Sequence, residues 1–458
     1  MSKHKFSIVP QSVPQVNTKN RLIHSKIPAE GTDKILERLS KVESRSMHGQ
    51  LPIVWDKADD FSVFDIAGNK WIDFTSTIFV ANVGHSNRAV TDAIKATLEH
   101  PLYSCYAYAN PIRAQYLERL VEFAGPPFQK AFLLSAGTEA TEAALKLMRM
   151  NGQKLGKRRC GIICIENNWH GRTLGAQMMS SNIGQSAWIG YKDADIHHIP
   201  FPYPWHLNER SSEDFLKSGL DSLVAKGIDL AQDVCGFMLE TFQGWGAIFY
   251  PKEFVQGIAK VCQQYEILLG FDEMQAGFGR TGKKFGFQHY NVQPDLICTG
   301  KGMGAGVPLS GVIGRAEIMD LPEIGNMSST HSANPLVCAA GLAVLNELEN
   351  RNLVEEANRK GQLFREGLES IQKRFPHRIS WILGNGMIMA VLFKEPITGK
   401  PDSSFASRVA ERCMQKGVLV VHTGRESIKL GPPLTISEAA LVEGISVISE
   451  SIGEVEAE

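Results

Sequence analysis

Short apolar runs alternate with longer helical patterns through the middle of the chain. The helical patterns cover 88–99, 111–124, 138–150 and 252–266, and the apolar runs cover 131–134, 161–165, 234–239, 267–271 and 296–298. Continuous apolar runs of this length are typical of strands that are buried on both faces. Strands that alternate with helices form a mostly parallel sheet covered by helices on both faces. The sequence therefore predicts an α/β fold for this region.

The chain has 458 residues, which is too many for one compact core, so we expect more than one domain. Beyond about residue 335, helices dominate around the strand-like runs "GMIMAVLF" and "GVLVVH". Near the other end, "SVFDIAGNKWIDF" predicts a hairpin with its turn at 67–69. We predict a large domain at 85–335, a small α+β domain built from 31–84 and 336–458, and an N-terminal arm at 1–30.

The charge balance argues against a charged macromolecular partner. Lys plus Arg is 48 and Asp plus Glu is 49, so the net charge is -1. Nothing here indicates nucleic-acid binding or a membrane surface. The eight cysteines lack the spacing of a metal site, and we expect none. Scattered thiols, no apolar leader and no apolar run long enough to span a bilayer predict a cytoplasmic protein.

Three of the apolar runs end on a charged residue. "CGFMLE" ends on Glu240, "EILLGFD" ends on Asp272, and "PDLICTGK" ends on Lys301. Ligands of parallel α/β sheets bind outside the carboxyl ends of the strands, so these side chains are expected to face one cleft. The alternative is a buried structural ion pair between Asp272 and Lys301.

The stretch "LLSAGTEATEAALKLM" predicts an anion site. A strand ends at Leu134, small residues follow, and a helix opens near Thr138. The free amides and the positive end of the helix dipole favour an anion, and Gly137 lets the backbone come close to it. A plain strand-to-helix turn is the alternative.

The surroundings of Lys301 and the "NNWHGRT" loop suggest a flat ligand. Lysine is a good nucleophile toward a carbonyl when its pKa is lowered by desolvation. Glycines at 300, 302, 304 and 306 leave room beside Lys301. Trp169 follows a buried strand directly and could lie against a planar ring, although a Trp–His pair is more often packing.

Together these features suit a planar cationic heterocycle that carries a phosphate and an aldehyde, which describes pyridoxal 5'-phosphate. Lys301 would hold the aldehyde as a Schiff base, and Asp272 would keep the pyridine nitrogen protonated. The carboxylate at the end of a buried strand would then have the pyridinium as its partner. No metal is implied.

The chain resembles the class III (ornithine/4-aminobutyrate type) pyridoxal-phosphate aminotransferases over nearly its whole length. The motifs that carry the resemblance include "SAGTEATEAALKLMR", "NWHGRTLGA", "ETFQG", "GFDEMQAGFGRTG", "DLICTGKGMGAGVPLSGVIG", "THSANPLVCAAG" and "LGPPLTI". The resemblance implies a fold type I transferase and a homodimer, or a dimer of dimers, with active sites at the subunit interface. It also implies ping-pong transfer of an amino group from an amine or amino acid, including ω-amino acids, to a 2-oxo acid or another carbonyl acceptor.

The same resemblance implies a role for individual residues. Asp272 and Lys301 are the implied catalytic residues. Glu240 is implied to be an acid that supports the residues in contact with the cofactor. The implied cofactor-binding residues are Gly137 and Thr138 at the phosphate, Trp169 on the ring, Gln275 near the ring hydroxyl, and Thr330, which would reach the phosphate of the neighbouring subunit.

The sequence departs from the family pattern in the substrate region. Lys429, in "SIKLGPPL", stands where many members have a carboxylate-binding arginine, and Trp245 stands where many have its glutamate partner. Lysine offers a point charge in place of a planar fork. Our hypothesis is a larger or more apolar pocket, lined also by Ile78, for at least one substrate that is not a dicarboxylate. Arg425 could bind a carboxylate instead, or Lys429 could still do so.

Two other classes of function compete with transamination. An amino-acid racemase or epimerase, or a decarboxylating transaminase, would use the same cofactor residues. A non-enzymatic regulator built on this fold is the other alternative, but the chain has no DNA-binding appendage.

Overall fold

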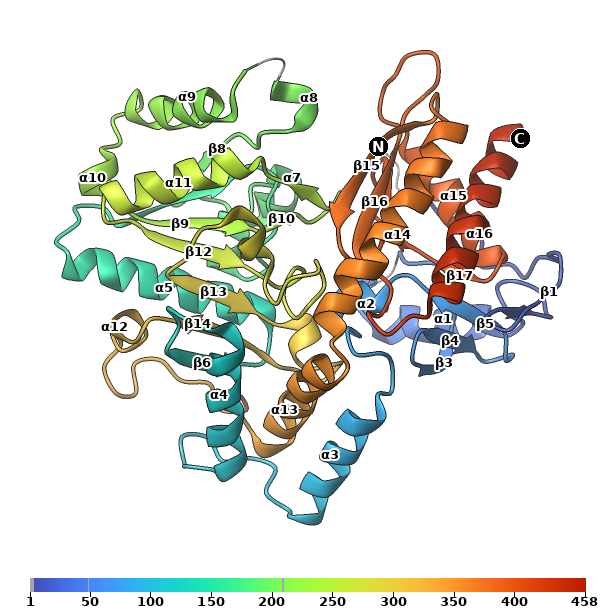
Figure 1. The fold of residues 1–458 in the computed structure, drawn as a ribbon, viewed down its shortest axis with the longest axis horizontal. Helices are drawn as coiled ribbons and strands as arrows, with labels where there is room; N and C mark the ends of the chain where they lie inside the picture. The colour runs from blue at the N-terminus through green and yellow to red at the C-terminus, as the bar shows by residue number, and fades with distance from the viewer. Residues whose placement is uncertain (1–3, 48, 208–209) are drawn as a thin grey trace. The chain divides into compact units, whose positions relative to one another are not determined.

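The computed structural model describes residues 4–47, 49–207 and 210–458. Contacts divide the chain into two compact units. The large unit comprises Arg88–Gly244 and Ile248–Val354, and the small unit comprises Met1–Asn87, Trp245–Ala247 and Glu355–Glu458. Each unit has its own sheets (Figure 1). The domain boundaries predicted near residues 84 and 335 stay a prediction.

In the described part of the chain, the large unit is built on a seven-stranded sheet with the order β6-β14-β13-β12-β9-β7-β8. β8, β7, β9, β12 and β13 pair in parallel, and β14 pairs antiparallel with β13 and β6. This mostly parallel sheet confirms the predicted α/β fold. Its strands are β6 (Lys130–Leu134), β7 (Gly161–Ile165), β8 (Ile196–Ile199), β9 (Val234–Glu240), β12 (Leu268–Asp272), β13 (Leu296–Thr299) and β14 (Ser310–Gly314), and β10 (Phe242–Gln243) and β11 (Ile248–Phe249) form a separate pair.

The helices of the large unit lie between these strands in the sequence. They are α3 (Arg88–Glu99), α4 (Pro111–Ala124), α5 (Gly137–Lys154), α6 (Leu174–Met179), α7 (Ile183–Ser186), α8 (Pro204–Leu207), α9 (Ser212–Val224), α10 (Leu230–Asp233), α11 (Lys252–Gln264), α12 (Ala316–Met319) and α13 (Pro335–Asn350). Single turns of 3-10 helix occur at Gly286–Tyr290 and Lys301–Met303. The predicted alternation of strand and helix is therefore present.

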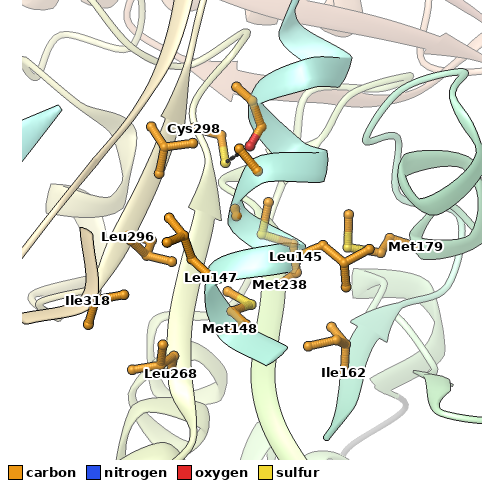
Figure 2. Close-up of a cluster of buried hydrophobic side chains, with 14 of the residues drawn as sticks. Leu145, Leu147, Met148, Ile162, Met179, Met238, Leu268, Leu296, Cys298 and Ile318 are labelled. Atoms are coloured by element: carbon orange, nitrogen blue, oxygen red, sulfur yellow. Dashed lines mark hydrogen bonds between the residues drawn. The ribbon is translucent and has the colours of Figure 1, made fainter. Parts of the chain in front are cut away.

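Helix α5 packs on the sheet and supplies much of the core of the large unit. Leu147 and Met148 are fully buried and belong to one apolar cluster with Ile162, Met238 and Leu296 of the strands (Figure 2). Burying each such side chain contributes about 1.5–3 kcal/mol to folding. The same packing fixes where α5 begins relative to the strand ends.

The small unit contains, among the described residues, a six-stranded and a four-stranded sheet. The first holds β1 (Val16–Asn17), β2 (Leu22–Ile23), β3 (Trp55–Asp59), β4 (Ser62–Asp65), β5 (Lys70–Asp73) and β17 (Val418–Leu419), and the second holds β15 (Ile379–Asn385), β16 (Ile388–Phe393), β18 (Val421–His422) and β19 (Ser427–Leu430). The helices are α1 (Thr32–Val42), α2 (Ser76–Phe79), α14 (Leu353–Arg374), which begins in the large unit, α15 (Ser403–Gln415) and α16 (Glu438–Ala457).

The predicted hairpin at 67–69 is present between β4 and β5. Asp65 Oδ1 accepts hydrogen bonds from the backbone amides of Ala67 and Asn69, and Gly68 adopts φ 84. An aspartate that bonds its own turn and a glycine at positive φ are the usual means of closing such a loop. The hairpin therefore follows from local turn chemistry. No helix in the described ranges is both long and apolar enough to cross a membrane.

We predict that Leu147→Ala destabilises the protein by about 2–5 kcal/mol, because it opens a cavity between α5 and the sheet. The control is Leu155→Ala at the end of the same helix, where the side chain is 44% exposed. The control should change the free energy of unfolding by less than about 0.5 kcal/mol. Thermal and urea unfolding followed by circular dichroism would measure both, and equal losses would contradict the packing role of Leu147.

Candidate active site

Three neighbouring strands bring the predicted acids and the lysine to one edge of the large-unit sheet. Asp272, the last residue of β12, pairs in register with Glu240 at the end of β9 and with Cys298 of β13. Lys301 lies three residues beyond Cys298, just after β13 ends at Thr299. Because parallel strands share their carboxyl edge, the three charged side chains start from adjacent positions.

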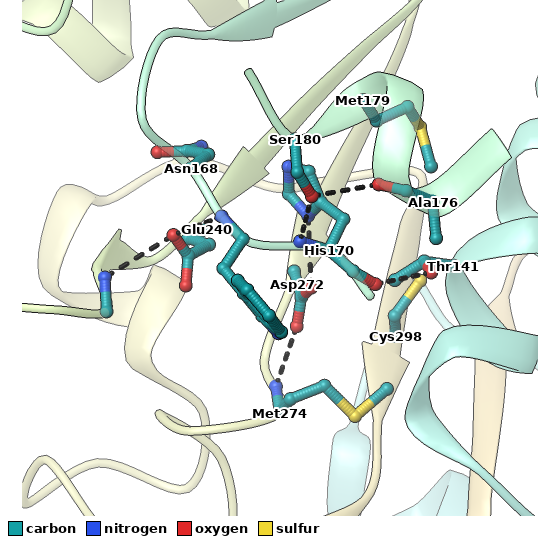
Figure 3. A network of polar contacts seen from close by, with 12 residues as sticks. Thr141, Asn168, His170, Ala176, Met179, Ser180, Glu240, Asp272, Met274 and Cys298 are labelled. Carbon is teal, nitrogen blue, oxygen red and sulfur yellow. Dashed lines mark hydrogen bonds and ion pairs between the residues drawn. The ribbon is translucent and has the colours of Figure 1, made fainter. Parts of the chain in front are cut away.

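Asp272 is held by two hydrogen bonds (Figure 3). Its Oδ2 lies 3.0 Å from Nδ1 of His170, and its Oδ1 accepts from the backbone amide of Met274 at 3.0 Å. The carboxylate is 5% exposed and His170 is 2% exposed. The contact with His170 therefore orients the carboxylate.

Hydrogen bonds of its backbone amide and carbonyl hold His170 in place. Its amide donates to Ser180 Oγ at 2.8 Å, and its carbonyl accepts from Thr141 Oγ1 at 2.8 Å (Figure 3). The sequence predicts that Trp169 stacks on a ring, but it gives His170 no role and does not connect it to Asp272. No spacing rule links residues 102 positions apart, so only the fold could show this partner.

Lys301 is half-buried and adopts a left-handed backbone conformation with φ 47. Such a conformation costs a non-glycine residue about 1–3 kcal/mol and is common at functional sites. Burial lowers the pKa of the Lys301 amine, and the negative charges of Asp272 and Glu240 oppose that shift. Among the described residues, no ion pair joins Lys301 to Asp272, whose paired group is His170. This arrangement argues against the alternative of a structural Asp272–Lys301 ion pair.

Glu240 connects its strand end to the loop that carries Trp169. Its Oε2 accepts hydrogen bonds from the backbone amides of Trp169 at 2.9 Å and Gly244 at 3.3 Å (Figure 3). Trp169 is half-buried, and the guanidinium of Arg172 lies 4.5 Å from its ring. The acid thus fixes the backbone of the predicted ring-stacking residue.

The start of α5 forms a cradle that suits an anion. The first amides of a helix have no partner within the helix. Glu139 Oε2 instead accepts from the amides of Ser135 and Ala136, before the helix, at 2.9 and 3.0 Å. Thr138 Oγ1 lies 2.6 Å from Thr173 Oγ1. The amides at the start of α5, where Gly137 and Thr138 are predicted to bind a phosphate, are of the kind that favours an anion.

Two glycines are required at this cradle by close approach. A Cβ on Gly137 would lie 2.8 Å from Met274 Sδ, and one on Gly171, which adopts φ 143, would lie 2.2 Å from Thr138 Oγ1. Gly137 brings the backbone against Met274, which follows β12, and Gly171 brings it against Thr138 of the cradle. The tight packing leaves the polar groups of the cradle in one arrangement.

Gln275 and Thr330 are the remaining predicted cofactor residues. Gln275 is half-buried, and a Cβ on Gly244 would lie 2.5 Å from its Nε2, so the loop after β9 packs closely on it. Thr330 is exposed in the segment that precedes α13. Its predicted contact with a neighbouring subunit stays a prediction.

The predicted substrate residues belong to the small unit. Ile78 is 38% exposed, at φ 67 in a turn where residues 76–79 all have positive φ. Lys429 is 5% exposed on β19, and its Nζ lies 4.6 Å from the ring of Phe79. Trp245 is stacked by the guanidinium of Arg425, 3.7 Å from its ring.

The residues of the large unit fit pyridoxal phosphate. The site offers an oriented carboxylate for a ring nitrogen, a lysine with a lowered pKa for an aldehyde, and helix amides for a phosphate. Trp169 offers an aromatic face for the ring. Each chemical group of the cofactor thus has a matching side chain or backbone group, which is the class of site found in pyridoxal-phosphate enzymes.

Comparison with known proteins gives the family. The class III aminotransferase family model matches residues 44–452. The chain is 32% identical to acetylornithine aminotransferase of Caldanaerobacter subterraneus over 89% of this chain and 96% of that protein. It is 30% identical to 4-aminobutyrate aminotransferase GabT of Escherichia coli, over 92% of this chain and 98% of that protein.

Solved structures agree with this fold. An ornithine aminotransferase from Toxoplasma gondii, whose structure is described with pyridoxal phosphate at its active site, superposes with a TM-score of 0.81 at 26% identity and covers 93% of this chain and 95% of its own. A transaminase from Virgibacillus gives a TM-score of 0.84 at 24% identity, covering 93% of this chain and 99% of its own.

The chain belongs to the class III aminotransferases. It is a pyridoxal-phosphate-dependent enzyme of fold type I that transfers amino groups. Nothing in these comparisons supports the racemase alternative.

We predict that cofactor-free protein takes up pyridoxal phosphate with a rate that rises with pH through a midpoint below 10.5, the pKa of an unperturbed lysine. The neutral amine is the nucleophile, and burial makes it available at lower pH. Asp272→Asn should move the midpoint further down, because Asp272 raises the pKa of Lys301. Glu240→Gln should do the same to a smaller extent.

Stopped-flow absorbance across pH would give the midpoints. Glu253→Gln, at an exposed acid in the first turn of α11, is the control and should leave the midpoint unchanged. A midpoint that does not respond to Asp272→Asn would contradict the electrostatic coupling.

Proposed function

We propose that Lys301 attaches pyridoxal phosphate through its Nζ and that Asp272 binds the ring nitrogen, in a ping-pong exchange between an amino donor and a carbonyl acceptor. One observation carries this proposal. Lys301 is desolvated and interacts with the negative charge of Asp272, whereas the hydrogen bond that orients Asp272 comes from His170 and not from Lys301. When bound, the cofactor supplies an electron-withdrawing ring that stabilises negative charge on the substrate carbon. Lys301 would move a proton at that carbon.

The other residues would hold the cofactor in one pose. Gly137 and Thr138 would bind the phosphate at the start of α5, and Trp169 would cover the ring. Gln275 would reach the ring hydroxyl. Glu240 fixes the backbone of Trp169, and its exchange for an apolar residue would release that loop.

We predict that Lys301→Ala abolishes the visible absorbance of the lysine-bound cofactor and lowers turnover by more than about 10³-fold, since nucleophile and proton carrier are lost together. Absorbance spectra with and without a panel of amines would test this. The wild-type spectrum should bleach with those amines that serve as donors. A spectrum that survives the substitution would contradict the assignment of Lys301.

We also propose a substrate class. Relatives are named for 4-aminobutyrate and 5-aminovalerate, whose amino groups lie far from the carboxylate. This supports a donor that carries its reacting amine on a terminal carbon. Lys429 and Trp245 replace the usual arginine and glutamate, which supports an acceptor smaller or less charged than a dicarboxylate.

We predict that pyruvate exceeds 2-oxoglutarate as acceptor by at least about tenfold in kcat/KM, a difference of about 1.4 kcal/mol. The second carboxylate of 2-oxoglutarate would have no planar arginine at residue 429. Coupled assays with one amino donor and each acceptor would measure the ratio. Faster turnover with 2-oxoglutarate would overturn the altered-pocket hypothesis.

The active unit is proposed to be a cytoplasmic homodimer, or a dimer of dimers. The exposure of Thr330 supports this, because a threonine in the "THSANP" motif is then available to a second subunit. Light scattering would give the oligomeric state, and Thr330→Ala would weaken cofactor binding without changing that state.

A further inference from the structure

Glu273 is a buried acid that the proposed mechanism does not use. It follows Asp272 directly in the chain, and it is fully buried, with 0% of its surface exposed. Burying a carboxylate costs free energy unless hydrogen bonds or a cation compensate for it. A second acid beside Asp272 therefore needs an explanation of its own.

Three hydrogen bonds converge on the Glu273 carboxylate, and all three come from neutral donors. Oε1 accepts from Thr241 Oγ1 at 2.6 Å and from the amide of Phe287 at 2.7 Å. Oε2 accepts from the amide of Gly286 at 2.7 Å. Distances of this kind are typical of hydrogen bonds to an ionised carboxylate.

The donors lie on two segments that Glu273 joins to the end of β12. Thr241 follows the last residue of β9, and the other two donors begin the 3-10 turn Gly286–Tyr290. The turn is bonded to the first segment a second time, because Tyr290 Oη donates to the carbonyl of Thr241 at 2.5 Å. The amide of Glu273 also donates to the carbonyl of Cys298 on β13 at 2.8 Å. Glu273 thus connects three neighbouring strand ends, where the charged residues of the site begin.

The direction of these hydrogen bonds requires the ionised form of Glu273. An ionised carboxylate only accepts, and a backbone amide only donates. A proton on the carboxyl group would therefore oppose one of the amides, or it would reverse the bond with Thr241, whose hydroxyl can also accept. Protonation would thus loosen the contact between β12 and the two segments.

The pKa of Glu273 places this change near neutral pH. Burial raises the pKa from its usual 4.5 to about 7, the hydrogen bonds oppose this rise, and the charge of Asp272 adds to it. Between these two values the folded protein binds the proton more tightly than the unfolded chain, so folding stability falls as the pH rises. The ionised form is therefore kept at a cost to stability, which indicates a role in function.

Other charged and titratable groups lie on the segments packed against this acid. Asp272 precedes it on β12, Glu240 ends β9, and the loop between β12 and the turn carries Arg280, which is fully buried. In the turn itself, burial lowers the pKa of His289 and raises that of Tyr290. These two residues therefore stay neutral at the pH where the acid between them and β12 changes its charge.

We infer that Glu273 is a positioning residue whose ionised carboxylate holds the ends of β9 and β12 together and so keeps Asp272 in place for the cofactor. It acts through Thr241 and the 3-10 turn, without a contact to the cofactor. This inference rests on the proposed function, because it concerns the binding of pyridoxal phosphate. Affinity for the cofactor is highest where Glu273 is ionised and falls as the acid is protonated.

The test titrates the full-length, cofactor-free chain with pyridoxal phosphate at about pH 5.5 and about pH 8.5, on either side of the Glu273 pKa of about 7. Quenching of tryptophan fluorescence gives Kd, and its ratio to the wild-type value removes the titration of the phosphate and of Lys301. Glu273→Gln places an amide donor where the protonated acid has its hydroxyl. It should raise Kd by about 10-fold at the higher pH and by less than about twofold at the lower pH. Equal losses at both pH values would indicate a merely structural role and would overturn the inference.

Thr241 supplies a second pair of variants, which decides the matter if Glu273→Gln does not fold. Thr241→Val removes a donor that lowers the pKa of Glu273, so the pH midpoint of cofactor affinity should move up. Thr241→Ser keeps the hydroxyl and should leave the midpoint unchanged. Circular dichroism would show that each variant is folded, and an unmoved midpoint in Thr241→Val would contradict the inference.

Glu395→Gln is the matched control, because the Glu395 carboxylate also accepts from two backbone amides, those of Ile397 and Thr398, in a turn of the small unit. It should leave Kd unchanged at both pH values. If the wild-type protein binds pyridoxal phosphate and the Glu273 and Thr241 variants bind it equally well, the inference fails and the proposed function stands. If the wild-type protein does not bind it, the proposed function fails, and the inference fails with it.

Discussion

The contact between His170 and Asp272 fixes the group on which the rest of the site depends. A buried carboxylate costs free energy unless it is paired or hydrogen-bonded. Here the register of β12 between β9 and β13 places Asp272, and the 3.0 Å contact with His170 orients it. His170 holds the carboxylate in one orientation at the end of β12.

Lys301 is balanced between two opposing effects. Burial lowers its pKa, and the neighbouring carboxylates raise it. If Lys301 formed an ion pair with Asp272, the amine would stay charged and would be a poor nucleophile. The sheet register places the two groups at the ends of neighbouring strands, and no ion pair joins them among the described residues.

The small unit uses a different principle, in which aromatic faces hold cations. Phe79 lies under Lys429 and Trp245 lies under Arg425. A π face attracts a cation without competing for its N–H groups.

The sequence by itself determined the strand-and-helix order, the polar residues at the strand ends, and the cofactor that suits them. Periodicity and turn residues are local, and for that reason α3 and α4 begin and end where the pattern predicts. The turn at Asp65 and Gly68 is likewise set by neighbours in the chain.

Only the tertiary structure decided which polar groups pair. His170 and Asp272 are 102 residues apart, and so no local pattern connects them. The left-handed turn at residues 76–79, with a β-branched isoleucine at positive φ, contradicts intrinsic backbone preference and persists through its bonds to distant residues such as Gly431. Whether Lys429 or Arg425 is the accessible cation also depends on packing around Phe79 and Trp245. Burial and close approach are properties of the folded chain, because they arise between residues that meet only after folding.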